Sequence, residues 1–527
     1  MITPLLWLVL LGPLGLLIAG LVAGRGSVGA RAGAEIAVAA AIGAFAVAVA
    51  VAIAVAVAVT GPLRSGLLGQ DGVGFGVYLD ALSAVMVVLV AFVGVIVVRY
   101  SRNYLDGNPG HARFTRWLCL TLAAVLTLIV SGNLLQLWLA WIATSLGLNQ
   151  LLLFYPDRRA AVLAARKKFV SSRLGDAAVL GAMVLLYRTF GTLDYAPLFA
   201  AAKALTVVPA AVHGAAVLLV VAALLKSAQA PLHGWLTEVM ETPTPVSALL
   251  HAGVINAGGF LVLRFAGVIA LSLPSLDLLV VVGGLTAIFA STVMLTQTSV
   301  KVALAWSTIA QMGFMMLECG LGAFSAALLH IVAHSLYKAH AFLSSGSVID
   351  LARASWSPSP GGRPHPARTA VAAILAGVVV VAALAVASRA APGVAVLGAV
   401  VVLGLIHLVT QALDERPHAA VIGRAVALAG IVAGSYFVLQ IVAERLTAGA
   451  LPATAALRSG FDLAMIGVVL IAFAVVTVLQ GVLPGGAGGT RWLAAYTHLA
   501  NGLYLNTVAN RLARRLWPAR LPPAGAR

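Results

Sequence analysis

The sequence has 527 residues, of which 61% are hydrophobic and 9% are charged, and its mean hydropathy is +1.05. A chain of this length could form several soluble domains, but this composition excludes that class of protein. The formal net charge of +17 could suggest a nucleic-acid-binding protein. In a membrane protein, however, the distribution of basic residues between the loops matters more than their total.

Apolar runs of about 20 residues, the length that a helix needs to cross the hydrocarbon core, follow one another along most of the chain. They are continuous rather than alternating, which favours helices. The sequence therefore predicts an all-α polytopic integral membrane protein with about fifteen transmembrane helices. The expected spans are residues 5–22, 35–59, 79–98, 114–131, 133–154, 168–188, 210–230, 243–270, 276–296, 300–318, 322–349, 370–388, 394–413, 423–443 and 462–482.

The basic residues are distributed unevenly between the connections. Most Lys and Arg residues fall on the odd-numbered connections and on the C-terminal tail. Because cytoplasmic loops are richer in these residues, we expect the N-terminus outside and the tail in the cytoplasm. The stretch 5–22 lacks a basic region before it, so we expect a retained first span. The stretch 492–517 is expected to be a basic helix at the membrane interface, with a docking surface for a cytoplasmic partner as the alternative.

A lysine closes the seventh apolar run, where the chain reads Lys226-Ser-Ala-Gln-Ala-Pro-Leu-His-Gly-Trp. Pro231 has no backbone donor, so it should break or kink the helix directly after Lys226. A broken helix beside an intramembrane lysine is a common design for an ion site. The alternative is that Lys226 only extends to the membrane interface. Against this alternative stand the polar residues that follow it and two acids, Glu238 and Glu241.

Three ionisable residues, His330, His334 and Lys338, are spaced four apart in the eleventh run, so one helix face carries them all. An amine near the middle of a bilayer is costly unless it faces protein or water, so we favour a proton relay. Two histidines four residues apart could instead share a metal ion, but no third ligand at a convincing spacing accompanies them. Structural polar packing is the remaining alternative.

Two further segments place polar residues inside apolar runs. His251 lies about two turns into the helix that begins at the two prolines after Thr242, and by itself it fits a core histidine equally well. Arg173 and Asp176 are three residues apart in the sixth run and should form an ion pair. With Lys226 on the next helix, Asp176 becomes a candidate for modulating the affinity of that lysine for protons.

These segments together resemble the antiporter-like subunits of respiratory complex I and of Mrp-type cation/proton antiporters. The resemblance rests on the run 226–235, on Glu241-Thr-Pro-Thr-Pro-Val-Ser-Ala-Leu-Leu-His-Ala and on Ala305-Trp-Ser-Thr-Ile-Ala-Gln-Met-Gly-Phe, and it covers roughly residues 75–350. It implies an antiporter-like fold with a hydrated chain of ionisable groups along the membrane midplane. In this sequence it implies a proton path through Lys226, His251, His330, His334 and Lys338, modulated by Arg173, Asp176, Glu238 and Glu241.

The resemblance also predicts how the chain is divided. We expect N-terminal transmembrane helices at 1–113, a first antiporter-like bundle at 114–270, a second at 271–445, and the last span with a basic cytoplasmic tail at 446–527. Two positions depart from the family pattern. The segment Trp141-Ile-Ala-Thr-Ser has no acid where the family has a glutamate in its fifth span, and the twelfth span has no interior lysine.

Within the family, three segments look most like DabB, the membrane subunit of DAB inorganic carbon pumps. They are Trp141-Ile-Ala-Thr-Ser-Leu, the run 334–347, and the tail segment Tyr496-Thr-His-Leu-Ala-Asn-Gly-Leu-Tyr. This resemblance implies a membrane subunit that passes protons or another cation inward and energises a soluble zinc protein, DabA, which hydrates carbon dioxide to bicarbonate. Accordingly, we expect no cofactor and no metal site in this chain. Its two cysteines, Cys119 and Cys319, lack the spacing of a zinc site.

Three functions remain open from the sequence. The first is a proton-conducting subunit of an energy-coupled inorganic carbon pump, with a DabA-like zinc-containing partner on the cytoplasmic side. The second is a proton-translocating antiporter-like subunit of a complex I or Mrp assembly, which would make it part of an oxidoreductase. The third is a non-conducting membrane anchor, favoured if the absence of an acid at Ile142 closes the path. We expect a multi-pass transporter subunit of the bacterial inner membrane rather than an enzyme.

Overall fold

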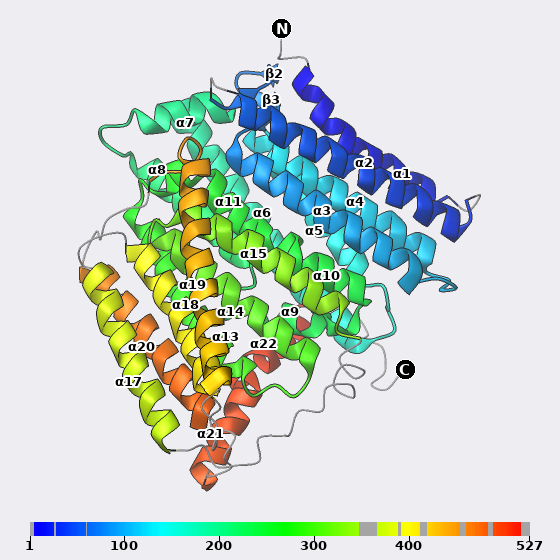
Figure 1. Cartoon of the computed structure of the whole chain (residues 1–527). Coiled ribbons are helices and arrows are strands. Elements are labelled where there is room, and N and C mark those ends of the chain that lie inside the picture. The colour runs from blue at the N-terminus through cyan, green and yellow to red at the C-terminus, as the bar shows by residue number, and fades with distance from the viewer. Residues whose placement is uncertain are drawn as a thin grey trace.

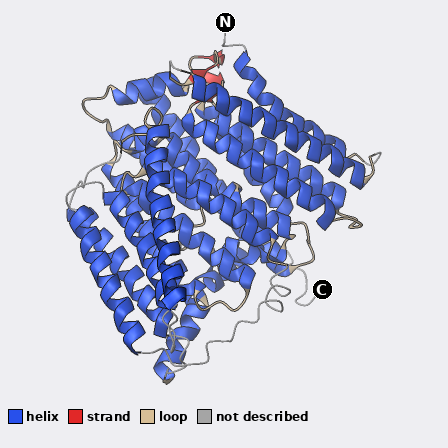
Figure 2. Ribbon diagram, in the orientation of Figure 1, coloured by secondary structure: helices blue, strands red, loops and turns tan. Residues whose placement is uncertain are grey.

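The computed structural model describes residues 5–25, 28–58, 61–346, 366–387, 392–411, 419–453, 460–482 and 489–517. Helices make up nearly all of these residues, and the strands are confined to one connection near the N-terminal end of the molecule (Figure 2). The buried hydrophobic side chains form one large cluster that extends from α1 to α15. Of two smaller clusters, one lies between the central helices and the later ones, and the other lies among the later helices.

The first helices lie side by side at one flank of the molecule (Figure 1). They are η1 (Leu5–Leu10), α1 (Leu11–Ala23), α2 (Ala30–Val57), α3 (Ala81–Tyr104), α4 (His111–Val130) and α5 (Leu134–Leu152). The centre holds α6 (Arg159–Phe190), α7 (Tyr195–Lys203), α8 (Ala210–Lys226), α9 (Gly234–Thr237), η2 (Glu238–Glu241), α10 (Thr244–Ala252), η3 (Val254–Asn256), α11 (Ala257–Arg264), α12 (Ala266–Ile269), α13 (Leu273–Met294), α14 (Val300–Gly320) and α15 (Phe324–Leu343).

Four later helices gather at the opposite flank (Figure 1). They are α17 (Pro366–Ala387), α18 (Pro392–Gln411), α19 (Ala419–Thr447) and α20 (Gly460–Val482). The chain then continues through α21 (Thr490–Ala500) and η5 (Gly502–Tyr504) to α22 (Leu505–Leu516), which contacts the central helices α6 and α9. The helix α20 packs against α13, α17 and α18, and α19 packs against α15 and α18. These contacts join the later helices to the central ones.

The prediction of a polytopic helical membrane protein is confirmed. In the described residues, ten helices are long and apolar enough to cross a membrane, and three shorter apolar helices lie at Ala210–Lys226, Ala370–Val386 and Ala395–Ile406. By this measure the apolar helices number ten to thirteen, against about fifteen expected spans. The expected spans 133–154 and 322–349 fall on α5 and α15, which carry more polar residues.

The connection between α2 and α3 contains short strands, which were not predicted from the sequence. It forms the strands β1 (Leu63–Arg64), β2 (Leu68–Gln70), β3 (Val73–Phe75) and β4 (Tyr78–Leu79), in which β1 pairs with β4 and β2 with β3. Asp71 and Gly72 join β2 to β3, and both have positive φ angles of 49° and 72°. A two-residue Asp-Gly turn of this kind matches the twist of a hairpin.

The helix break after Lys226 is present, as predicted. The helix α8 ends at Lys226, and the next helical turn begins only at Gly234. A second break was not predicted, because the span 243–270 was expected to be continuous. It occurs at Gly253, where φ is −125° and ψ is −73°. The side chain of Asn256 donates a hydrogen bond to the carbonyl of Ala252 at 3.1 Å, which satisfies an acceptor at the interrupted helix end.

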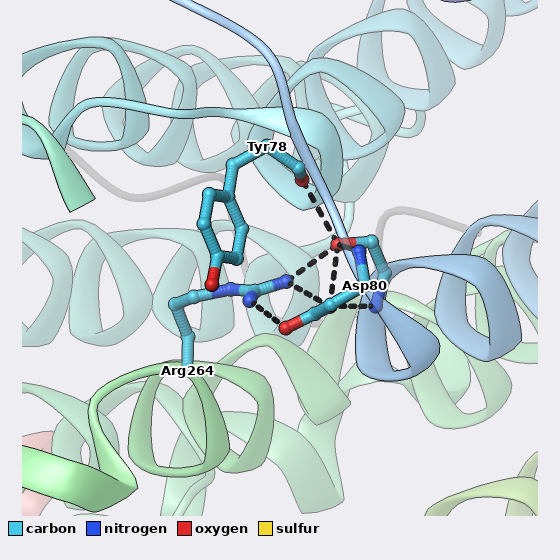
Figure 3. A network of polar contacts seen from close by, with 4 residues as sticks. Tyr78, Asp80 and Arg264 are labelled. Carbon is cyan, nitrogen blue, oxygen red and sulfur yellow. Dashed lines mark hydrogen bonds and ion pairs between the residues drawn. The ribbon is translucent and has the colours of Figure 1, made fainter. Parts of the chain in front are cut away.

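A buried ion pair connects α3 to α11 (Figure 3). Asp80 caps the first turn of α3, and its carboxylate accepts two hydrogen bonds from the Arg264 guanidinium, at 2.7 and 3.2 Å. Arg264 also donates to the hydroxyl of Ser83 at 2.6 Å. Both charged residues are almost fully buried, and Arg264 was not identified from the sequence. A bidentate pair of this kind fixes the positions of both helices.

The tail folds back onto the central helices. In α22, the side-chain amides of Asn506 and Asn510 both donate to Glu238, at 2.8 and 2.7 Å. Glu238 is also ion-paired with Lys167 of α6 at 2.8 Å, and Trp517 packs edge-on against Phe169. The predicted helical character of this stretch is confirmed, although it is divided between α21 and α22. The polar side of α22 thus faces its own chain.

The first prediction concerns the Asp80–Arg264 pair. Replacing Arg264 with Gln should lower the free energy of unfolding by about 3–5 kcal/mol, because it leaves a buried carboxylate without its partner. Unfolding of the purified protein in detergent measures this loss. Arg102→Gln is the matched control, since Arg102 pairs with Glu35 at 2.9 Å on the surface and should contribute about 1 kcal/mol or less. Equal losses in the two variants would contradict a special role for the buried pair.

Candidate functional site

Lys226 lies at the end of α8, directly before the break, and is 4% exposed. Its Nζ donates to the Ser145 hydroxyl at 2.7 Å and to the Trp141 carbonyl at 3.3 Å, and it lies 4.3 Å from the centre of the Trp141 ring. The helix α5 therefore holds the amine through a hydroxyl, a carbonyl and an aromatic face. No acid takes part, and Ser145 lies nearly one turn beyond Ile142, where the family has its glutamate.

The helix α6 packs beside α8 and brings further charges toward Lys226. Arg173 and Asp176 form the expected ion pair, with a distance of 2.7 Å between guanidinium and carboxylate. Asp176 also interacts electrostatically with Lys226 and with Lys168. Lys168 is 2% exposed, bonds to Ser172, and lies over the Trp235 ring at 5.2 Å. Residues 168, 172 and 176 share one face of α6, so a polar row leads along this helix toward Lys226.

The two glutamates that were predicted to modulate the path have different outcomes. Glu238 is engaged by Lys167 and by the two asparagines of α22, as described above. Glu241 belongs to η2, but its side chain lies outside the described part of the chain. Among the described contacts, Glu238 therefore belongs to the tail interface rather than to the surroundings of Lys226.

Lys338 and His251 contact neighbouring groups on the same turn of α14. Lys338 is fully buried and donates to the Leu304 carbonyl at 3.2 Å. The hydroxyl of Thr308 donates to the same carbonyl at 3.0 Å and lies 3.0 Å from Nδ1 of His251. Because the hydroxyl hydrogen is used on Leu304, Nδ1 of His251 is the donor in the second contact. His251 lies in the last turn of α10, and its ring stacks on the ring of Phe342 with 4.3 Å between the ring centroids.

The row continues along α15 from His251 to His334 and His330. Nε2 of His334 is 3.2 Å from the His251 carbonyl oxygen, and the rings of His334 and His330 are 6.2 Å apart. His330 then contacts Glu318 of α14, with 3.0 Å between Nδ1 and Oε1. The structure thus brings the four predicted residues His251, His330, His334 and Lys338 into one row, hereafter the α15 row. Lys226 makes its hydrogen bonds to α5, in a separate cluster.

A cavity of about 550 Å³ lies beside the α15 row. Helices α13, α14 and α15 form one side of it, and α18, α19 and α20 form the other. Its polar lining residues are Ser291, Ser307, Gln311, His330, His334, Tyr337, Tyr436 and Thr477. A space of this volume with several polar groups can hold water beside the rings of the two histidines.

Several residues of the site were missed in the sequence. Glu318 is a lone acid at the end of an apolar run, and Lys168 lies at the start of the sixth expected span. The rule that ionisable groups inside spans are functional candidates could have found both. Thr308 carried no such signal, because threonine is common in helices. Within the described residues, no group of three or more His, Cys, Asp or Glu side chains could hold a metal ion.

Comparisons with known proteins agree with this architecture. A family model described as "NADH:quinone oxidoreductase/Mrp antiporter, TM" matches residues 131–357, and "NADH-Ubiquinone oxidoreductase (complex I), chain 5 N-terminus" matches residues 69–115. A protein of Halothiobacillus neapolitanus named "Probable inorganic carbon transporter subunit DabB2" is 42% identical over 454 residues. These residues cover 84% of this chain and 81% of that protein. The chain belongs to the antiporter-like membrane subunit family of complex I and Mrp antiporters.

Other members of the antiporter-like family match shorter stretches. "Probable inorganic carbon transporter subunit DabB" of Hydrogenovibrio crunogenus is 50% identical over 273 residues, which cover 52% of this chain and 53% of that protein. "NADH-quinone oxidoreductase subunit L" of Mycobacterium tuberculosis is 39% identical over 280 residues, which cover 53% of this chain and 44% of that protein. The predicted resemblance, including its closeness to DabB, is confirmed.

Two solved structures share the antiporter-like fold. The Mrp complex from Dietzia sp. matches with a TM-score of 0.57 and 24% identity, over 99% of this chain and 58% of that chain. The archaeal membrane-bound sulfane sulfur reductase matches with a TM-score of 0.59 and 18% identity, over 97% and 99%. At these identities the likeness concerns the fold alone.

The second prediction tests the cavity beside the α15 row. A cysteine at Ser307, which lines the cavity, should react with a small water-soluble thiol reagent at least about tenfold faster than a buried thiol, because only solvated thiols ionise readily. Labelling of the purified protein measures the rates. Ala305→Cys is the matched control on the same helix, since Ala305 is fully buried. The natural Cys119 and Cys319 are also fully buried and supply the background rate. Equal rates at 305 and 307 would argue against water in the cavity.

Proposed function

We propose that this chain is the proton-conducting membrane subunit of an energy-coupled inorganic carbon pump, working with a soluble zinc-containing partner on the cytoplasmic side. The observation that carries the proposal is the α15 row, in which four ionisable side chains lie in sequence. Lys338 and His251 both contact α14, His334 contacts the His251 carbonyl, and the rings of His334 and His330 are 6.2 Å apart. Similarity to two proteins named as inorganic carbon transporter subunits supports the choice of pump.

The surroundings of the two lysines favour conduction over the role of a non-conducting anchor. An adjacent carboxylate would stabilise a lysine in its charged form. Lys226 instead makes its hydrogen bonds to a hydroxyl and a carbonyl, with Asp176 acting on it through space only, and Lys338 bonds to a carbonyl. These uncharged partners accept a hydrogen bond from a protonated or a neutral amine. Loss of the acid at Ile142 therefore leaves Lys226 able to change its charge.

A complex I or Mrp assembly is the second candidate. Family membership favours it in general, and a complex I subunit of Mycobacterium tuberculosis is 39% identical over part of the chain. The match to that subunit covers less than half of its length, whereas the match to the DabB2 protein covers 81%. Co-purification with dehydrogenase or antiporter subunits, instead of one soluble zinc protein, would support this second candidate.

The third prediction addresses the two lysines. Lys226→Arg and Lys338→Arg should each lower bicarbonate accumulation by about a hundredfold, since arginine stays charged and cannot cycle its proton. Bicarbonate accumulation is measured in a host that lacks its own carbon pump, with each variant produced at the wild-type level. Lys203→Arg is the control, because Lys203 is exposed at the end of α7 and should accept the change without effect. Near-normal accumulation in both test variants would leave the anchor function as the better explanation.

We further propose that the tail is the docking element for the partner and faces the cytoplasm. The face of α22 that points away from the chain presents Val508, Leu512 and Leu516, which are 61, 54 and 65% exposed. They are spaced four apart and form a continuous apolar stripe, bordered by arginines at 511, 514 and 515. A contiguous exposed apolar patch marks an interaction site.

The fourth prediction separates this stripe from the rest of the tail. The triple variant Val508→Ser, Leu512→Ser and Leu516→Ser should release the soluble partner during co-purification, because it removes the apolar contact surface. The docked face of α22 is unchanged in this variant, so trypsin should cleave at the tail arginines as slowly as in the wild type. Deleting residues 492–527 should release the partner as well. If the partner stays bound to both variants, its interface lies on another part of the chain.

A further inference from the structure

The last turn of α14 contains a buried carboxylate that is not part of the proton path proposed above. Glu318 lies two residues before the helix ends at Gly320, and it is only 2% exposed. An acidic side chain within a span is costly unless it is paired or takes part in proton movement. Its presence at this position therefore requires a physical explanation.

Glu318 and His330 form a pair with unused bonding capacity on both sides. The two side chains meet through Oε1 and Nδ1, 3.0 Å apart. Their other polar atoms, Oε2 of Glu318 and Nε2 of His330, are buried and have no hydrogen-bond partner in the described part of the chain. A carboxylate oxygen can accept a proton or a hydrogen bond, and a ring nitrogen can give or take a proton. Each member thus has one polar atom that is not used in a hydrogen bond and can bind a proton.

The pair lies at one end of the α15 row. Lys338 contacts the Leu304 carbonyl near the start of α14, whereas Glu318 lies near the end of the same helix. The row therefore advances along α14 from one membrane boundary toward the other. In the orientation that we propose for the chain, Glu318 marks the outer end.

The surroundings of the pair can supply water and contain few other ionisable groups. His330 lines the cavity of about 550 Å³, together with His334 and Tyr436. Tyr436 of α19 interacts electrostatically with Glu318, and Cys319 is the neighbouring residue in the chain. The described surroundings include no Lys or Arg in an ion pair with Glu318, so its carboxylate is not held in the charged form by a fixed cation.

The absence of an interior lysine from α17 leaves the proton path without a terminal group, which this pair can supply. The helix α17, which corresponds to the twelfth expected span, has Arg368 in its first turn and no other charged residue, so it lacks the interior lysine of the family. A proton path that passes through His334 then needs another group that exchanges the proton with water. Glu318 is an acid in contact with the last histidine of the row.

We propose that Glu318 and His330 form a proton-binding site that ends the α15 row. Water at the outer end of α14 protonates the Glu318 carboxylate. The carboxylic acid gives this proton to Nδ1 of the His330 imidazole, which carries its own hydrogen on Nε2, so a carboxylate and an imidazolium result. The imidazolium gives up the proton on Nε2 toward His334, and exchange of the remaining proton from Nδ1 to Nε2 restores the starting imidazole. This inference rests on the proposed function for the direction in which the proton moves and for what its movement drives. Proton binding at the pair can be measured without the proposed function.

Infrared difference spectroscopy of the purified full chain in lipid nanodiscs tests proton binding directly. Acidifying the wild type should produce a protonated-carboxyl band that shifts in D₂O, and E318Q should lack this band. Glu35→Gln is the control, since Glu35 forms an exposed ion pair with Arg102 and its loss should leave the band in place. An unchanged band in E318Q would overturn the assignment, whatever the chain transports.

Proton flux into vesicles tests the role of the site in the path. E318Q should lower the flux at least about tenfold, and E318D, which keeps an ionisable carboxyl, should restore part of it. Thermal unfolding must show that E318Q is folded, and His330→Gln should repeat the flux defect from the other member of the pair. Normal flux in E318Q would overturn the terminal role. If the wild type itself carries no proton flux, the proposed function fails, while the infrared result still decides whether the pair binds a proton.

Discussion

The cost of placing a charge inside a membrane protein governs the arrangement of every ionisable residue in the centre of this chain. An ion that leaves water loses several kcal/mol of hydration, and its neighbours must replace that stabilisation. Arg264 meets this demand through two hydrogen bonds to Asp80 and one to Ser83. Lys226 and Lys338 bond only to a hydroxyl and carbonyls, and Asp176 acts on Lys226 through space without a hydrogen bond. The same constraint therefore produces one fully compensated charge and two incompletely compensated ones.

This difference separates structural groups from groups suited to proton transfer. A bidentate pair between guanidinium and carboxylate keeps both partners charged, so Arg264 and Asp80 can hold α3 against α11. An amine or imidazole with uncharged partners can change its protonation state without leaving an unpaired opposite charge behind. Lys226, Lys338, His251 and His334 make their hydrogen bonds to such uncharged partners, whereas His330 contacts the Glu318 carboxylate. The break after α8 and the break at Gly253 place Lys226 and His251 at helix ends, where backbone acceptors are available.

The sequence was informative where a pattern has one physical meaning. Long apolar runs can only be helices in lipid, Pro231 could not continue α8, and the four-residue spacing had to place His330, His334 and Lys338 on one face. It was uninformative where the outcome depends on packing between distant segments. Nothing in the sequence pairs Arg264 with Asp80, which are far apart in the chain. The break at Gly253 was missed because glycine is frequent in transmembrane helices and usually does not interrupt them.

The docking of α22 has a consequence for how the membrane subunit is completed. Its contacts are made to Lys167 and Glu238, which lie in the first half of the chain, whereas Asn506 and Asn510 follow all the described spans. The apolar stripe can reach its position only after the intervening helices have been inserted and packed. A protein that recognises the stripe would thus meet it correctly placed only on a fully assembled subunit. A docked tail would therefore indicate that membrane insertion is complete before the complex forms.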